Sequence, residues 1–305
     1  MGRKLLIAKS LFRQFPGLHI GIVIARGINN TVKSEEIMKK TRQKELEIRG
    51  RLTKSELSEH PNVKPWRLAY SWFGAKPKKY KCSIEALLLR ILGGDNLPDI
   101  NALVNLYNFV SIDKLLPIGA DDLDKIDGGI RLTQAEGNEK YVEIGTLEEK
   151  NPKENEVVYM DDKEVLCRRW NWRESEKTKL TEDTKNVIVY AESLLGKELA
   201  EQTVNELAEL MKDVVGGEIN TFILDEQHNA LNIETGELHE EGFGVEAEKK
   251  TEEEKELEAE KKDIEEKQKK HDQKDLPKKG LKKSALHWAD AIAEEVIERV
   301  ERDPM

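Results

Sequence analysis

Long hydrophobic runs are missing from this 305-residue sequence, and their absence narrows where the protein can work. No stretch approaches the roughly 20 consecutive apolar residues that a membrane-spanning helix needs. Residues 1–12 also lack the apolar core and small-residue cleavage site of a secretory signal peptide. We therefore expect a cytoplasmic protein with no membrane partner.

Cysteine and the common catalytic motifs are equally scarce. The two cysteines, Cys82 and Cys167, stand alone in their neighbourhoods, which argues against a disulfide framework and a zinc knuckle. The six histidines show neither an HExxH motif nor another paired spacing, so we expect no bound metal. The motifs GxSxG, GxGxxG and GxxxxGKS/T are also absent. Their absence disfavours a synthetase in its own right, and we expect no cofactor.

Acidic residues outnumber basic ones by 60 to 50, which gives a net charge of −10 at pH 7. This balance argues against a protein that coats nucleic acid, although a local basic face can still bind phosphate. Residues 64–90 form such a segment, because seven basic residues face one acidic residue and five aromatic side chains are interleaved. Its candidates for binding a sugar-phosphate backbone are Lys76, Lys78, Lys79 and Lys81. The alternative is a solvated loop over the edge of a core.

Three regions differ in composition. Residues 1–240 mix short β-rich runs with amphipathic helical segments and turns, which predicts one globular domain. Residues 241–283 are so rich in both charges that we expect a tether, either disordered or a solvated helix. Residues 284–305 carry an apolar stripe at helical spacing, which predicts a short amphipathic helix that needs a surface to dock on.

Within the globular part, periodicity and stop signals predict several elements. Residues 34–52, 82–94 and 197–217 read as amphipathic helices, and a strand follows from residue 221. Ser83 is placed to cap the second helix. Glycine pairs at the ends of the second and third segments would stop those helices.

A first candidate site is a set of three amides. Asn101, Asn105 and Asn108 are spaced so that they project from one face of a helix. An amide both donates and accepts hydrogen bonds, which suits a ligand with amino and carbonyl groups. The alternative is that these amides cap and staple a loop.

A second candidate lies in CRRWNWRESEKT, residues 167–178, where arginines and tryptophans alternate. As a strand, this stretch would send Arg168, Trp170 and Trp172 to one side. Arg169, Asn171 and Arg173 would point to the other side. Aromatic walls with guanidinium donors could hold an aminoacyl group, a phosphate or a nucleotide, and a stacking cluster that locks the sheet is the alternative.

Four stretches of the sequence together resemble a known family. They are FPGLHIGIVIARGINN, SWFGAKPKKYKCSIEALLLRIL, LPDINALVNLYNFVSIDKLLPIGADDLDKIDG and ENEVVYMDDKEVLCRRWNWRESEKTKLTEDTKNVIVYAES. The chain is similar, over about residues 10–235, to free-standing relatives of the B3/B4 editing domain of the phenylalanyl-tRNA synthetase beta subunit. The resemblance implies an α+β fold with three layers, an unusual β-sandwich and flanking helices. It also implies a deacylase that acts in trans on misacylated tRNA.

The motifs of that family match only in part. NALVNLYNFV keeps the pocket asparagine as Asn108, while Tyr107 stands in place of the pocket threonine and Asn105 in place of an aspartate. The place of the editing histidine falls at Gly119, and that of the pocket glutamate at Tyr190. Both residues that read the tyrosine hydroxyl are therefore replaced, so tyrosine is a poor substrate hypothesis. The family's glycine-rich segment is occupied here by residues 171–175, which suggests a pocket wall rebuilt for another acyl group.

The resemblance leads to a set of expected roles. Glu174 would orient a water, with Arg169 and Asn171 as its catalytic neighbours, and the asparagines would bind the amino acid. Arg168, Arg169 or Arg173 would contact the terminal phosphates or the oxyanion. The alternative is a non-catalytic module that binds tRNA or a free amino acid. The tail HWADAIAEEVIERV resembles the start of class I lysyl-tRNA synthetases, which would make a synthetase the docking partner; packing on its own domain is the alternative.

Overall fold

The structure is a computed structural model and describes residues 2–244. The predicted tether at 241–283 lies outside the described residues from residue 245 onward. The helix predicted for 284–305 lies wholly outside them, so both stay predictions.

Helices and strands alternate along the chain in the mixed order that an α+β fold requires. The helices are α1 (Lys9–Gln14), α2 (Glu35–Arg51), α3 (Lys64–Trp72), α4 (Ser83–Leu92), α5 (Ala102–Lys114) and α6 (Lys197–Val214), with single 3-10 turns η1 (Leu57–Glu59) and η2 (Leu123–Lys125). The strands are β1 (Lys4–Ile7), β2 (His19–Arg26), β3 (Ile118–Asp122), β4 (Ile130–Gln134), β5 (Val157–Met160), β6 (Val165–Arg168), β7 (Arg173–Glu174), β8 (Asn186–Ser193), β9 (Glu218–Leu224), β10 (Ala230–Asn232) and β11 (Leu238–His239). The helices predicted at 34–52, 82–94 and 197–217 and the strand from 221 are confirmed.

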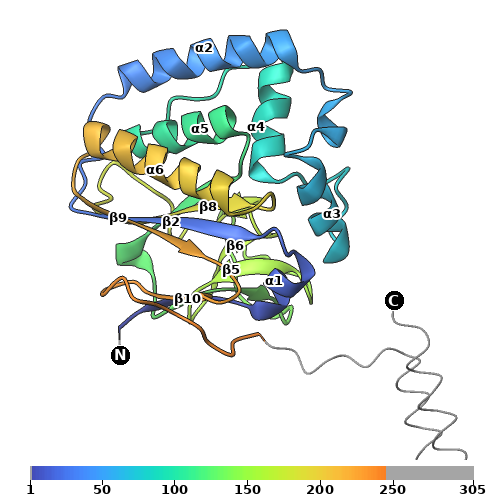
Figure 1. Cartoon of the computed structure of the whole chain (residues 1–305), viewed down its shortest axis with the longest axis vertical. Coiled ribbons are helices and arrows are strands. Elements are labelled where there is room, and N and C mark those ends of the chain that lie inside the picture. The colour runs from blue at the N-terminus through green and yellow to red at the C-terminus, as the bar shows by residue number, and fades with distance from the viewer. Residues whose placement is uncertain (1, 245–305) are drawn as a thin grey trace, which may run out of the picture. The chain divides into compact units, whose positions relative to one another are not determined.

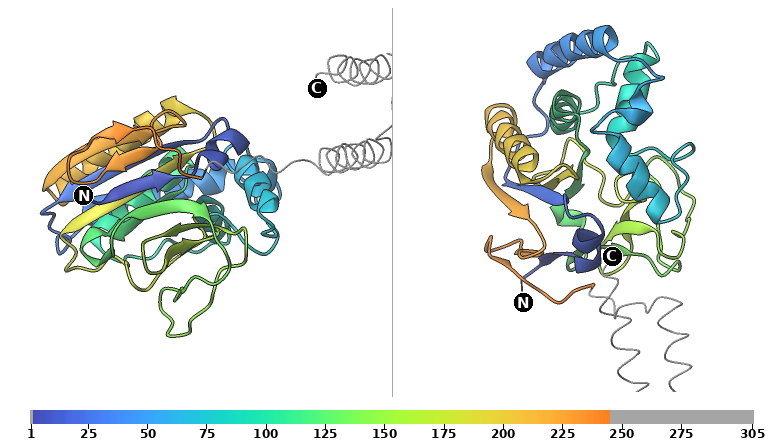
Figure 2. Two further views of the ribbon diagram at one scale, coloured as in Figure 1. Left: turned by 90° about the horizontal axis from the view of Figure 1, so that it is seen from below. Right: turned by 45° about the vertical axis from the view of Figure 1, so that its right-hand side comes forward.

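The strands form two sheets that face each other beneath a layer of helices (Figure 1). One sheet has four strands in the order β3-β8-β2-β9, and the other has seven in the order β11-β10-β1-β4-β5-β6-β7. α5 and α6 lie over the outer face of the four-stranded sheet, while α3 and α4 lie at one end of the molecule, as the second view in Figure 2 also shows. This arrangement of helices, sheet and sheet confirms the predicted α+β class.

The four-stranded sheet lies between the helices and the seven-stranded sheet, and the alternation of its side chains explains why both of its faces are covered. On β2, Ile20, Ile22 and Ile24 belong to the core shared with the seven-stranded sheet. Val23 and Ala25, between them, belong to the core beneath the helices. Since successive side chains of a strand point to opposite faces, an apolar run this long fits a strand that is buried on both sides.

Gly21 allows α6 to lie directly against this sheet. A methyl group at its Cα would come within 2.3 Å of Val204 Cγ1 and 3.3 Å of the Ala200 carbonyl oxygen. No larger residue fits at this position without moving the helix. The sheet and the helix layer are thereby held at a fixed distance next to β8, which carries part of the site described below.

Two local predictions are wrong. Ser83 is the first residue of α4 and not its cap; Cys82 precedes the helix, and no side-chain hydrogen bond caps it. The stretch from 167 to 178 is not one strand, because β6 ends at Arg168 and β7 begins at Arg173. Between them Arg169 and Trp170 adopt left-handed backbone angles, with φ of 49° and 67°. Such angles reverse the chain, so the expected alternation of side chains is lost.

Candidate functional site

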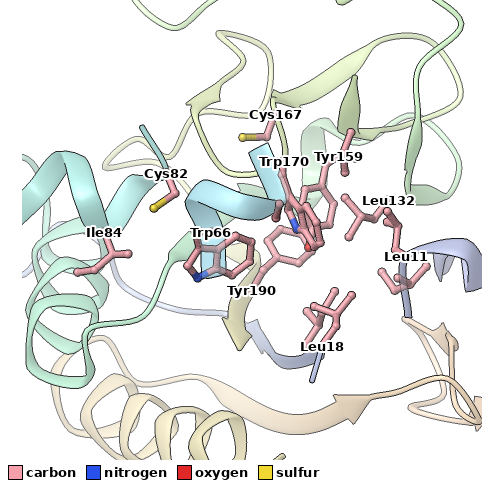
Figure 3. Packing of buried hydrophobic residues seen from close by; sticks show 14 of the residues in the cluster. Leu11, Leu18, Trp66, Cys82, Ile84, Leu132, Tyr159, Cys167, Trp170 and Tyr190 are labelled. Carbon is pink, nitrogen blue, oxygen red and sulfur yellow. The ribbon is translucent and has the colours of Figure 1, made fainter. Parts of the chain in front are cut away.

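A small cavity lies inside the sandwich, where β3 and β8 of one sheet face β5, β6 and β7 of the other. It measures about 20 Å³, which is room for a single water molecule. Its walls are Ser83, Ile118, Gly119, Asp121, Tyr159, Cys167, Trp170, Asn171, Glu174, Tyr190 and Glu192. Figure 3 shows Tyr159, Trp170 and Tyr190 gathered together, with Cys167 close by.

Strand pairing brings the two positions singled out by the family resemblance together. Gly119 on β3 pairs directly with Tyr190 on β8. A Cβ atom at Gly119 would lie 2.8 Å from Glu174 Oε1, so the Glu174 carboxylate lies against the bare glycine backbone. Gly119, Tyr190 and Glu174, predicted as site residues from three separate stretches, therefore line one cavity.

Alternation along the same two strands adds two carboxylates. Asp121 lies two residues after Gly119 and Glu192 two residues after Tyr190, so both point to the side of the sheet that faces the cavity. We did not predict either residue as part of the site. The period of two along β3 and β8 was the signal that could have found them.

The Glu192 carboxylate is buried and holds the cavity wall together. It accepts hydrogen bonds of 2.7 Å from the Tyr159 hydroxyl, the Trp170 Nε1 and the Asn171 Nδ2. The Asn171 Oδ1 accepts in turn from the Tyr70 hydroxyl at 3.0 Å. Burial raises the pKa of Glu192 to about 7, against the opposing effect of these donors. This network explains how the turn after β6 is fixed.

The other two carboxylates are less well compensated. Burial raises the pKa of Asp121 to about 6, although the Thr178 hydroxyl donates to this carboxylate. Burial, together with the charges of Asp121 and Glu192, raises the pKa of Glu174 well above its ordinary value. Within residues 2–244, none of these three acids forms an ion pair with a lysine, arginine or histidine. The cavity is therefore acidic and has no cation of its own.

Two hydroxyl groups in the cavity wall also lack partners. The Ser83 Oγ is buried and makes no hydrogen bond to any described residue. The Tyr190 Oη has no partner in good hydrogen-bond geometry, although it lies close enough to the Asp121 carboxylate to influence its pKa. Burial raises the pKa of Tyr190, and the nearby Asp121 charge adds to this shift. Buried polar atoms without partners cost free energy, and in native proteins they mark a place for water or a ligand.

The arginines of the 167–178 stretch do not line the cavity. Arg168 forms a buried two-pronged ion pair with Glu156, at 2.8 and 3.0 Å. The Arg169 guanidinium lies over two rings, 3.8 Å from the centre of Tyr80 and 4.3 Å from that of Trp172. Its Nη2 is 3.6 Å from Glu156, while its Nη1 has no partner among the described residues. Arg173 is exposed on the surface.

The asparagines divide into two groups. The Asn101 side chain caps α5 by accepting from the Val104 amide at 3.0 Å. Asn105 is buried and donates to Asp99 and to Ser34. These two amides hold the start of α5, which is the alternative that the sequence left open. Asn108 and Tyr107 lie further along α5 and are half-buried.

Tyr107 is the part of α5 that comes near the cavity. Burial raises its pKa, and the charges of Glu174 and Asp121 contribute in the same direction. The residue that stands at the family's threonine position is therefore close to the acidic cavity without lining it.

The basic loop between α3 and α4 is only partly available. Lys76, Lys78 and Lys79 are exposed, whereas Lys81 is half-buried and donates to the Pro77 carbonyl oxygen of the same loop. Lys79 also lies 5.1 Å from the centre of the Tyr80 ring. Three of the four predicted lysines thus face outward beside the ring that stacks on Arg169.

In residues 2–244, no three metal-ligating side chains come together in a way that could hold a metal ion. Over the same residues, no helix has the length and apolar character needed to cross a bilayer.

The chain is similar to a known protein family and to solved structures. Residues 65–212 match the B3/4 domain family. Among solved structures, the chain is similar to an N-terminal fragment of the phenylalanyl-tRNA synthetase beta-subunit from Pyrococcus horikoshii, at 16% identity and a TM-score of 0.38. The match covers 70% of this chain and 49% of that fragment, so the chain spans about half of its length. No curated protein matches.

The family match covers the site as well as the fold. Every residue that lines the cavity, from Ser83 to Glu192, falls within the matched range. The match to the B3/4 domain family over residues 65–212 agrees with the sequence resemblance.

Proposed function

We propose that the protein hydrolyses misacylated aminoacyl-tRNA in trans and that the cavity between the sheets receives the end of the acyl group. The observation that carries this proposal is Glu174, a carboxylate without a cation that lies against Gly119 and opposite Tyr190. In the family that the sequence resembles, the matching positions read the acyl side chain. Here they form an acidic cavity with two unpartnered hydroxyls.

The size of the cavity argues against tyrosine as the acyl group. It measures about 20 Å³, whereas an apolar cavity that binds benzene has about 150 Å³. The Glu174 carboxylate and the Tyr190 ring occupy the space that a phenol would need. The part of the acyl group that enters the cavity is therefore no larger than a single non-hydrogen atom with its hydrogens.

The Glu174 carboxylate lies in the cavity wall against Gly119, and this position changes the role that the sequence suggested for it. We assign this carboxylate to the acyl group instead of to the attacking water. The hydroxyl next to the ester on the terminal ribose can orient that water, and the protein then has to hold the ester in place. We assign Asn171 to positioning the cavity wall, since its amide donates to Glu192 and accepts from Tyr70.

The tRNA itself would bind on the outer surface near Trp172. Arg173 and the exposed lysines Lys76, Lys78 and Lys79 provide positive charge there, and Tyr80 and Trp172 provide rings on which a base can stack. Arg168 is excluded from this role, because its Nε and Nη2 both donate hydrogen bonds to the Glu156 carboxylate.

The small cavity also supports a second candidate, a module that binds tRNA without hydrolysing it. A deacylation assay over a panel of misacylated tRNAs, run beside a binding titration with the same tRNAs, separates the two. We expect ester turnover that falls in Glu174→Gln and persists in Glu182→Gln, a change of an exposed carboxylate outside the cavity. Saturable tRNA binding without turnover of any ester would establish the second candidate.

A further inference from the structure

The cavity brings three carboxyl groups together without a cationic side chain. Three carboxylates, from Asp121, Glu174 and Glu192, belong to its wall, and the wall contains no lysine, arginine or histidine. Buried charges in proteins are normally paired, and an unpaired buried carboxylate becomes protonated or waits for a cation. The charge of the cavity therefore points to a cationic ligand.

The unpartnered hydroxyls point to a ligand that donates hydrogen bonds. Tyr190 is only 4% exposed and lines the cavity, and in the described part of the chain its Oη has the Asp121 carboxylate beside it but no partner in good hydrogen-bond geometry. The Ser83 Oγ shares this condition in the same wall. An ammonium group has three donors and no acceptor. One donor can reach each hydroxyl oxygen, and the third can reach the Glu174 carboxylate.

The aromatic side chains of the wall favour an organic cation over a metal ion. The Tyr159 and Tyr190 rings lie 4.6 Å apart, and Trp170 is fully buried next to them. Aromatic faces attract ammonium groups by the cation–π interaction. The carboxylates, by contrast, do not converge as metal ligands anywhere in residues 2–244.

We propose that this cavity is a binding site for a primary ammonium group. The volume of about 20 Å³ admits the NH3+ end of a primary ammonium and excludes a quaternary ammonium, whose nitrogen carries four carbon groups. The ammonium would donate hydrogen bonds to the Glu174 carboxylate and to the hydroxyl oxygens of Tyr190 and Ser83. As a statement about the substrate, the inference rests on the proposed deacylase function; as a statement about the site, it does not.

Ammonium binding should be coupled to proton release. Burial, with the charges of Asp121 and Glu192, raises the pKa of Glu174, so a bound cation should favour loss of protons from these carboxyl groups. Affinity should then rise with pH through the range in which Glu174, Asp121 and Glu192 ionise. The titratable groups that face the cavity or lie beside it come from α5, β3, β5, β6, β7 and β8: Tyr107, Asp121, Tyr159, Cys167, Glu174, Tyr190 and Glu192.

The test uses methylammonium chloride as the probe and the full chain, followed by calorimetric titration. We expect saturable binding at about pH 8 that weakens at about pH 5.5, and no binding of tetramethylammonium or methanol. Glu174→Gln should weaken binding by about tenfold or more, since it removes a charged hydrogen-bond partner, and Glu182→Gln should leave it unchanged. Equal heats from methylammonium and tetramethylammonium, or tighter binding of potassium, would overturn the proposal. The comparison of ligands and pH values on the unmodified protein does not depend on how either variant folds.

A second experiment identifies the source of the ammonium in the substrate. A tRNA misacylated with lysine is compared with its Nα-acetyl and Nε-acetyl forms as substrates for hydrolysis. Loss of turnover on Nε-acetylation assigns the cavity to a side-chain ammonium, and loss on Nα-acetylation assigns it to the α-ammonium. Equal turnover of all three forms would overturn the inference while leaving the deacylase function intact. Methylammonium binding without turnover of any ester would keep the ammonium site and overturn the deacylase function.

Discussion

Raising the pH should destabilise this protein across a range in which most proteins are at their most stable. Burial raises the pKa of Glu192 from 4.5 to about 7. A carboxyl group whose pKa is higher in the folded state contributes stability that is complete below its unfolded pKa. That contribution is lost as the pH rises through the folded pKa. At about 1.4 kcal/mol for each pKa unit, Glu192 alone should cost about 3 kcal/mol between about pH 4.5 and pH 7.5.

Other buried acids enlarge the fall and do not change its direction. Glu174 is one of them, because its pKa is raised well above its ordinary value. Asp121 acts in the same direction, because burial raises its pKa from 3.8 to about 6. Asp127 does not contribute in this range, since Lys163 and Lys177 hold its pKa at about 2. His60 acts in the opposite direction, because burial lowers its pKa and its charged form is favoured in the unfolded chain.

Urea unfolding of the full chain at a series of pH values measures the effect. We expect the free energy of unfolding to fall between about pH 5 and pH 8, and Glu192→Gln to remove about 3 kcal/mol of that fall. Glu182→Gln, which changes an exposed carboxylate, should leave the slope as it is. A stability that stays level or rises with pH, in the wild type and in Glu192→Gln alike, would refute the assignment of Glu192 as a buried acid.

Two further predictions test the packing and the tRNA surface. Gly21→Ala should lower the free energy of unfolding by about 1 to 3 kcal/mol, because the new methyl group lies 2.3 Å from an atom of α6. Gly50→Ala is the matched control, since nothing lies within 4 Å of the added methyl group there. Equal urea midpoints for both variants would contradict the packing of α6 on Gly21. Replacing Lys76, Lys78 and Lys79 together by alanine should weaken tRNA binding and reduce the slope of log affinity against log salt by about 2. An unchanged slope in filter-binding titrations would remove these lysines from the interface.

Most of the fold could be predicted from local patterns. The segments that became α2, α4 and α6 carry helical periodicity, and the apolar runs that became β2 and β8 are long enough for buried strands. The pairing of β1 with β4, parallel and far apart in the sequence, has no local signal. It depends on how the two sheets pack, which a single sequence does not display.

The site was predictable where the family resemblance placed residues and less so elsewhere. Gly119 and Tyr190 were found by motif position, and strand pairing brings them together. Glu192 was missed although it lies two residues from Tyr190, because the family pattern directed attention to the aligned position alone. The expected strand through Arg169 and Trp170 failed because both residues adopt positive φ, which neither residue type signals.

The proposed function requires that the cavity beside Gly119 holds the acyl group of an aminoacyl-tRNA. Single-turnover hydrolysis by the wild type, Glu174→Gln and Glu182→Gln of the misacylated tRNA that the wild type turns over fastest in the panel tests this directly. We expect the wild type and Glu182→Gln to release the amino acid at the same rate and Glu174→Gln to be slower by about tenfold or more, for loss of a charged contact to the acyl group. Identical rates for all three proteins would show that the cavity takes no part in the reaction.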